Sequence, residues 1–172
     1  MDALLAIASK RELRDDYLPD PVPGEVVTRI LEAARIAGTS RNRQPLRFVV
    51  VQNRGLLDEL AATVARATNL QGAPLFVAIA ARGEGRLAFD GGRAAQNMML
   101  AAWAEGIGSC PNAFVDPQRA ANLLGLHPDQ ELLIGLTFGV PARKRPPERR
   151  TREEWLARAD RLPLEELVQA WL

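Results

Sequence analysis

A run of cations near the start of the chain, KRELR at residues 10–14, has residue types that suit a chemical task. Arginine can bind phosphate oxygens through two parallel N–H bonds, and lysine binds them as a point charge. The run therefore indicates an anion site. An ordinary solvated surface carries such charges as well, so the run by itself leaves both interpretations open.

A second polar stretch, GTSRNRQP at residues 38–45, comes directly before an apolar run. It concentrates hydrogen-bond donors and acceptors on Thr39, Ser40, Asn42 and Gln44. Loops positioned by a rigid scaffold commonly supply ligand-binding groups, which makes this loop a candidate ligand contact. Plain loop composition explains the same residues.

Residue types for covalent or acid–base catalysis are scarce. The one histidine, His127, lies in a predicted loop, and we interpret it as a surface residue. The one cysteine, Cys110, lies in a predicted strand without a basic sequence neighbour, which is typical of a small buried hydrophobe. Neither a disulfide framework nor a zinc cluster can be built from them, and no metal site is predicted. If the protein is an enzyme, its chemistry should come from a borrowed cofactor.

The composition describes one ordinary globular domain, predicted to span residues 1–172. The chain is 47% apolar and 25% charged, and its net charge of +1 gives no electrostatic case for nucleic acid. The opening MDALLAIASK is too short for a signal peptide and has Asp2 where a basic region belongs, which predicts a cytoplasmic protein. No membrane association is predicted, because the most apolar segment is short and contains Arg93 and Gln96.

That apolar segment, residues 90–108, is predicted to form the central helix. Asp90 is the expected N-cap, and Gly106 the expected stop. Apolar side chains occupy nearly the whole circumference, namely Ala94, Ala95, Met98, Met99, Leu100, Ala101, Ala102, Trp103 and Ala104. Such a helix is expected to be buried.

The other periodic segments predict the elements that position these residues. Apolar residues at helical spacing predict helices at 2–9, 24–37, 54–68 and 116–125. Apolar and β-branched runs predict strands at 47–52, 75–81, 107–114 and 131–140. This order predicts an α+β or α/β sandwich with four or five strands.

The end of the chain differs in composition. Residues 142–150, ARKRPPERR, form a basic, proline-bearing segment that is expected to be extended and unpacked. TREE at residues 151–154 is a capping-box pattern, and helices are predicted within 151–172.

Five stretches, in order, resemble the motifs of the FMN-dependent nitroreductase family. The run at 10–14 with Tyr17 resembles R-R-S-I-R and a following aromatic, and residues 37–46 resemble A-P-S-x-x-N-x-Q-P-W. Ala73-Pro74 resembles an A-P pair before a strand. The central helix through Ser109 resembles a D-x-G-x-x-x-Q-N helix that ends in G-[IL]-G-[ST]. Residues 161–166 resemble R-x-P-L-E-E. The resemblance covers most of the chain.

The resemblance implies an α+β, nitroreductase-like three-layer sandwich, with a mixed sheet of four to five strands flanked by helices, in a homodimer with FMN at the interface. It implies that Lys10, Arg11, Arg14 and Arg161 hold the FMN phosphate and ribityl chain. It implies that the flavin ring contacts Thr39, Ser40 and Asn42 from the partner chain, then Pro111, Asn112 and Ala113, and Asn69 at the ring edge. Segment 142–150 is hypothesised to wrap over the partner subunit.

The implied activity is hydride transfer from NADH or NADPH through the flavin to a nitro, quinone or related electrophilic acceptor. No catalytic side chain is required. The chain departs from the family pattern at Lys10, Glu12, Gly38 and Leu46, where the family has arginine, serine, proline and tryptophan. Glu12 and Leu46 motivate the alternative of a non-catalytic protein that keeps the fold and binds flavin, another ligand or a protein partner. A deazaflavin binder is a third possibility.

Overall fold

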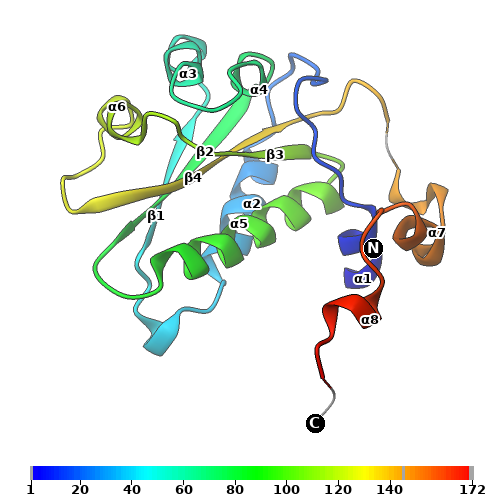
Figure 1. Ribbon diagram of the computed structural model, residues 1–172. Coiled ribbons are helices and arrows are strands. Elements are labelled where there is room, and N and C mark those ends of the chain that lie inside the picture. Colours follow the sequence, from blue (N-terminus) through cyan, green and yellow to red (C-terminus); the bar gives the residue numbers. More distant parts are fainter. Residues whose placement is uncertain (1, 145, 171–172) are drawn as a thin grey trace.

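A four-stranded sheet with helices on both faces forms the body of the protein in the computed structural model, which describes residues 2–144 and 146–170 (Figure 1). The strands are β1 (Leu46–Val51), β2 (Leu75–Arg82), β3 (Gly108–Asn112) and β4 (Gln130–Gly139), in the order β1-β2-β4-β3. The helices are α1 (Ala3–Ser9), α2 (Gly24–Arg35), α3 (Arg54–Ala61), α4 (Thr68–Gln71), α5 (Leu87–Ala104), α6 (Pro117–Leu123), α7 (Arg152–Ala157) and α8 (Leu164–Leu167), with 3₁₀ turns at Ser40–Asn42 and Pro147–Arg149.

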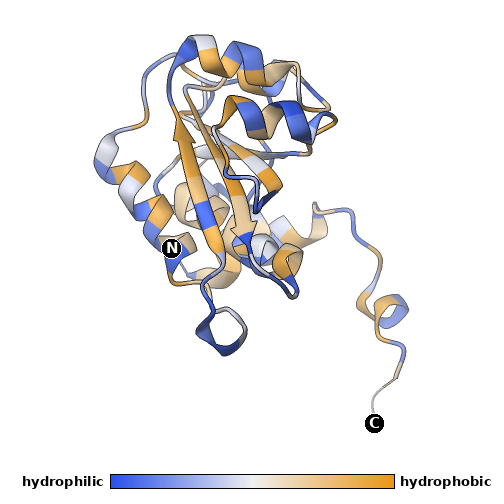
Figure 2. Ribbon diagram, turned by 90° about the vertical axis from the view of Figure 1, so that its left-hand side faces the viewer, coloured by the Kyte–Doolittle hydropathy of each residue, from blue (hydrophilic) through white to orange (hydrophobic). Residues whose placement is uncertain are grey.

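The central strand β2 separates two apolar cores, because alternate side chains of a strand point to opposite faces. Leu75, Val77 and Ile79 pack with α2 and α5 on one face. Phe76 and Ala78 pack with α3, α4 and α6 on the other. The apolar colouring of the central strands in Figure 2 follows from this burial on both faces. The three-layer arrangement predicted from the sequence is confirmed.

All three strand pairs are antiparallel, so the prediction of a mixed sheet is wrong. The prediction of one helix over residues 54–68 is also wrong, and the two errors are connected. α3 ends at Ala61, and the chain turns before the short α4 returns it to the end of the sheet that it left, so that Val51 lies opposite Phe76. A single long helix would have delivered the chain to the far end, as in a parallel crossover.

The central helix α5 begins one turn earlier than predicted. Leu87 is its first residue, Arg86 takes the N-cap position, and Asp90 lies buried within the first turn. α5 packs on the sheet beside α2, where Asn97 Nδ2 donates to Ala33 O at 3.1 Å. One face of α5 is nevertheless exposed in the single chain, with Phe89 63% exposed, so the prediction of burial on all sides is wrong for one chain.

The segment between α1 and α2 runs along the outer edge of β3 and then beside the residues that follow β4. Leu13 N donates to Ser109 O at 3.0 Å, and Leu18 N donates to Val140 O at 2.8 Å. Gly108 is required at the crossing, because a Cβ there would lie 2.4 Å from Leu13 Cδ2. This edge therefore holds the basic run 10–14 against the start of β3.

The basic segment 142–150 is mostly exposed among its described residues, while its end forms a turn against α1. It contains the 3₁₀ turn Pro147–Arg149, which contacts α1, and α7 also packs on α1. Trp155 of α7 donates from Nε1 to Pro147 O at 2.8 Å, and this bond closes the segment onto the helix. The predicted capping box at Thr151 and Glu154 is confirmed. Beyond α7, α8 covers Leu164–Leu167 only, and residues 171–172 of the predicted terminal helix lie outside the described part of the chain.

Candidate functional site

Two of the predicted cofactor-binding cations, Lys10 and Arg14, lie near the start of β3. The charges closest to the Cys110 thiol are those of Glu12, Arg14 and Lys10. Burial raises the pKa of Cys110, and the Glu12 carboxylate raises it further, while the two cations oppose that rise. The thiol is therefore poorly ionised, which agrees with its interpretation as a structural residue.

Lys10 is held by two neighbours. Its side chain is only 7% exposed, and Nζ donates to Glu12 Oε1 at 2.6 Å. Nζ also approaches Met99 Sδ of α5 at 3.4 Å. The positive charge of Lys10 is thus partly compensated by a carboxylate from the same run, as the sequence departure at Glu12 indicated.

Asn69 and Asn112, both predicted as cofactor contacts, are brought together from α4 and β3. Asn69 Nδ2 donates to Asn112 Oδ1 at 2.7 Å, and Asn112 Nδ2 donates to Cys110 O at 2.9 Å. Both side chains are buried. Asn69 Oδ1 and the nearby Ser109 Oγ have no hydrogen-bond partner. A buried acceptor without a donor is costly, so a ligand N–H would stabilise this position.

Pro111 and Ala113 are exposed on either side of the buried Asn112. This alternation is that of a strand with one face turned to solvent. The two exposed residues offer an apolar rim beside the asparagine pair. A planar ring placed there would need a second wall to exclude water from its other face.

The predicted loop residues Thr39, Ser40 and Asn42 lie elsewhere. Thr39 and Ser40 line a pocket together with Phe89 and Arg93 from the first half of α5. The loop is held by a bond from Arg93 Nη1 to Gly38 O at 2.6 Å. The backbone at Asn42 has a φ of 55°, in the left-handed region that asparagine tolerates well.

The two groups of predicted residues therefore lie toward opposite ends of α5. The loop group meets α5 at its first turns, whereas Lys10 meets Met99 and Ser9 accepts a bond from Trp103 near the last turn. An α-helix rises about 1.5 Å per residue, so along α5 Phe89 is separated from Met99 by roughly 15 Å and from Trp103 by roughly 20 Å. Figure 1 shows the same separation, with the loop before β1 at one end of α5 and α1 at the other.

Arg11 and Arg161 are not brought to Lys10 and Arg14. The charges nearest to the Arg11 guanidinium are Arg161, Arg158 and Arg150. Sequence reasoning did not assign a binding role to Arg150, Arg158 or Trp155, which share this second location. Their positions in and beside the short helix that begins at the TREE capping box could have indicated this shared location, because a short helix keeps such residues close together.

The residues around Asn69 fit the FMN that the family resemblance implies. The unpartnered Asn69 acceptor suits the ring N–H of an isoalloxazine, and the Arg14 guanidinium suits a phosphate or a polyol. The Glu12 carboxylate opposes an anion there. Among the described residues there is no cluster of His, Cys, Asp and Glu that could ligate a metal. Within residues 2–144 and 146–170, none of the helices combines the length and apolar character that a membrane span requires.

The model of the nitroreductase family matches residues 7–80 and 58–140 of the chain. Two curated relatives extend the comparison. A protein of Methanothermobacter thermautotrophicus, named as a candidate NADH dehydrogenase/NAD(P)H nitroreductase, is 30% identical over 114 residues, which are 63% of this chain and 59% of the relative. The chain thus spans less than two thirds of that relative. An NADH dehydrogenase of Thermus thermophilus is 27% identical over an alignment that covers 98% of this chain and 95% of the relative.

Solved structures share the fold over the whole chain. A protein of Desulfovibrio desulfuricans, solved in complex with FMN, superposes with a TM-score of 0.82 at 27% identity and covers 100% of this chain and 98% of its own. A nitroreductase family protein of Clostridium difficile 630 also gives a TM-score of 0.82, at 24% identity, with 98% of each chain covered. The second likeness concerns the fold alone.

Proposed function

Because the chain belongs to the nitroreductase family, we propose that it uses FMN to carry reducing equivalents from NADH or NADPH to a nitro, quinone or related electrophilic acceptor. The observation that carries the proposal is the buried Asn69–Asn112 pair, whose free acceptor lies at the β3 edge that also holds Lys10 and Arg14. The FMN complex of the protein from Desulfovibrio desulfuricans supports the choice of cofactor.

We assign the residues of one chain to three contacts. Arg14 and Lys10 hold the phosphate and the ribityl chain through charge-assisted hydrogen bonds. Asn69 accepts from the ring edge, and Asn112 holds Asn69 in place. Pro111 and Ala113 contact the ring because they are the exposed residues that flank Asn112.

The second wall of the site is proposed to come from the loop residues Thr39, Ser40 and Asn42 of another copy. Within one chain this loop lies toward the far end of α5, while one face of α5 is exposed and presents Phe89 beside small residues and Arg93. Pairing of two α5 helices would bury that face and could bring each loop to the other chain's β3 edge. The proposed assembly is a homodimer with two shared sites.

When bound, FMN supplies two-electron redox chemistry between the nicotinamide and the acceptor. The chain's own residues bind and orient the ring, exclude water from one face and present the other face to the nicotinamide. Arg14 would supply positive charge to the phosphate and ribityl chain, the contact assigned to it above.

Absorbance spectroscopy provides the direct test. The purified chain should show flavin bands, or gain them with added FMN, and anaerobic NADH or NADPH should bleach them. A protein that takes up no FMN, or whose bound FMN is indifferent to both nucleotides, would contradict the proposal.

Site sharing is tested by mixing two inactive variants. Arg14→Ala and Asn42→Ala damage different halves of the proposed site, so a heterodimer should contain one intact site. Unfolding and refolding an equal mixture should restore about a quarter of the native sites, since half of the dimers are mixed and each has one good site. Recovery no greater than that of either variant refolded alone would show that both halves act within one chain.

The alternative of a non-catalytic member is favoured by one observation, the ion pair between Glu12 and Lys10. In that pair Lys10 is already bound to a carboxylate, although a phosphate would need its positive charge. Folded, dimeric protein that binds no FMN under saturating conditions is the result expected of this alternative.

A further inference from the structure

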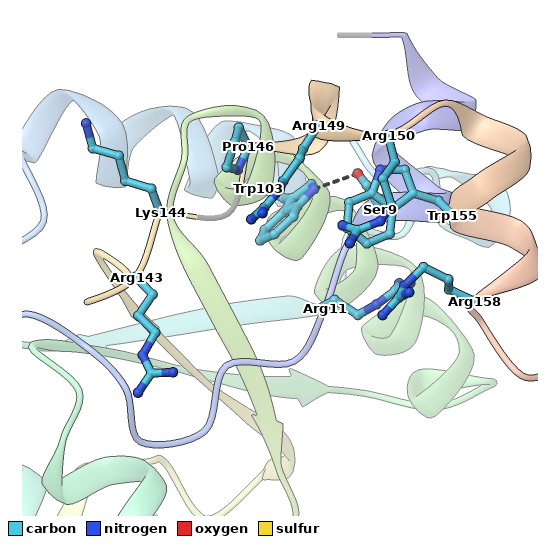
Figure 3. Close-up of a pocket in the computed structure, with 10 residues that line it drawn as sticks. All are labelled: Ser9, Arg11, Trp103, Arg143, Lys144, Pro146, Arg149, Arg150, Trp155 and Arg158. Atoms are coloured by element: carbon cyan, nitrogen blue, oxygen red, sulfur yellow. Dashed lines mark hydrogen bonds between the residues drawn. The ribbon is translucent and has the colours of Figure 1, made fainter.

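A second cationic pocket lies between α1, the Pro147–Arg149 turn and α7 (Figure 3). Its lining residues are Ser9, Arg11, Trp103, Arg143, Lys144, Pro146, Arg149, Arg150, Trp155 and Arg158. Six of these ten are arginine or lysine, and none of them is acidic. The pocket therefore concentrates positive charge around two indole rings.

Two guanidinium groups in this pocket are already fixed in position. The guanidinium carbons of Arg11 and Arg150 lie 5.0 Å and 4.9 Å from the centroid of the Trp155 ring. Arg11 Nη1 also donates to Ala8 O and Lys10 O, at 2.9 Å each. The Trp155 ring is itself held by its bond to Pro147 O. Groups that are ordered before binding lose little conformational entropy when a ligand arrives.

These charges are not neutralised by neighbouring carboxylates. Within the described chain, no carboxylate lies within 4.0 Å of Arg11, Arg149, Arg150 or Arg158. Arg143 is different, because its Nε lies 4.0 Å from Asp16 Oδ2. Burial lowers the pKa of Arg11, and Arg161, Arg158 and Arg150 lower it further, as expected for like charges without a counterion.

We propose that this pocket binds a phosphate monoester dianion, at a site separate from the proposed FMN site. A dianion with three acceptor oxygens can engage the forked N–H groups of several arginines at once, which a single carboxylate cannot do. The pocket differs from the β3 edge in its cations, because Arg11 is surrounded by Arg150, Arg158 and Arg161, whereas Lys10 and Arg14 surround Cys110.

Two sources share this chemistry, namely free inorganic phosphate and the 2′-phosphate of NADPH. The second source would deepen the proposed function, on which it rests, because it would give the enzyme a reason to prefer NADPH over NADH. The binding of inorganic phosphate itself does not depend on that function.

Calorimetric titration of inorganic phosphate into the full chain tests the proposal, with FMN supplied in excess. The test variant is Arg150→Gln, and the matched control is Arg152→Gln, whose side chain pairs with Glu153 and does not line the pocket. Loss of a charge-assisted fork should weaken phosphate binding about ten-fold or more in Arg150→Gln, and leave Arg152→Gln near the native value. Arg158→Gln serves as a second test variant if Arg150→Gln does not fold.

Three results would overturn the proposal. The first is native protein that binds no phosphate at all. The second is phosphate binding only in the absence of FMN, which would make the pocket the phosphate subsite of the flavin. The third is equal weakening of binding by Arg150→Gln and Arg152→Gln, which would indicate general charge attraction. If the chain takes up no FMN, the same titration on flavin-free protein still tests the pocket, so the two proposals fail separately.

Coenzyme binding then distinguishes the source. Competition of phosphate with NADPH but not with NADH, abolished in Arg150→Gln, would support the 2′-phosphate as the occupant. Phosphate binding that leaves both coenzymes unaffected would support free phosphate or another phosphate monoester.

Discussion

Glu12 is the residue that most directly limits the proposed cofactor site. Its carboxylate takes a hydrogen bond from Lys10 and brings a negative charge to a place where a phosphate should bind. We expect Glu12→Ser to free Lys10, remove the repulsion and tighten FMN binding about ten-fold, as a change of roughly 1.4 kcal/mol would do. Quenching of FMN fluorescence on titration measures the affinity.

Glu25→Ser is the matched control, because Glu25 is an exposed acid in the first turn of α2. It changes the net charge equally without touching the site. An equal gain in both variants would mean that overall charge, rather than the Lys10 contact, controls affinity.

Cys110 offers a second test at the residue scale. Burial raises the pKa of its thiol, so fewer thiolates exist at a given alkaline pH in the folded protein than in the unfolded one. We expect alkylation by iodoacetamide to be at least about ten-fold slower in native protein, with its rise displaced to higher pH than in guanidinium chloride. Alkylation rates followed by mass spectrometry across neutral to alkaline pH provide the check.

The same shift has a defined sign for stability. Because the folded thiol ionises at higher pH, rising pH lowers the free energy of the unfolded state before that of the folded state. The contribution of Cys110 should therefore be lost as pH rises above the ordinary thiol pKa. For the alkylation experiment, rates that coincide in native and unfolded protein would contradict the buried placement of Cys110.

At the scale of elements, β4 passes close under an aromatic pair. A Cβ on Gly135 would lie 2.3 Å from Phe76 Cζ and 3.2 Å from Phe114 Cζ, where the two rings meet edge to face. Gly135→Ala should destabilise the fold by about 1–3 kcal/mol, because the buried Phe76 ring, packed against Phe114, has little room to move aside. Urea unfolding followed by circular dichroism measures the change.

Gly24→Ala is the control for that experiment, since nothing lies within 4 Å of the position where its Cβ would be. Its effect should be small. A tolerated Gly135→Ala would mean that the ring pair is more loosely packed than the geometry indicates.

At the scale of the whole molecule, the exposed face of α5 predicts self-association. Phe89 is 63% exposed in the first turn of α5, in a cavity beside α2 that combines apolar and small residues with Arg93, Gln96 and Asn97. We expect the native chain to sediment at twice 18.8 kDa. Phe89→Glu should raise the dimer dissociation constant about ten-fold or more, because burying an unpaired carboxylate is costly.

Val115→Glu is the comparison, because Val115 is equally exposed, at 65%, and precedes α6 on the other side of the sheet. It should leave the dimer intact. A native chain that sediments as a monomer would remove the basis for a shared site.

The sequence by itself determined the layers, the strands and the two polar groups at residues 10–14 and 38–45, because local periodicity and composition fix which segments are apolar. Tertiary structure decided the rest. The break after Ala61 follows from the bond of Ala65 N to Ala113 O and the bridge of Val64 with Phe114, contacts that no local pattern encodes. The antiparallel pairing of β1 and β2 then follows from that break.

The candidate site divides in the same way. Residue types predicted the anion site at Lys10 and Arg14, and the family resemblance added Asn69 and Asn112, yet only folding placed Asn69 beside Asn112, because α4 and β3 are far apart in sequence. Folding also separated Arg11 from Lys10, since neighbouring side chains on an extended segment point to opposite sides. Sequence therefore names the groups that can do chemistry, and three-dimensional packing decides which of them can act on the same ligand.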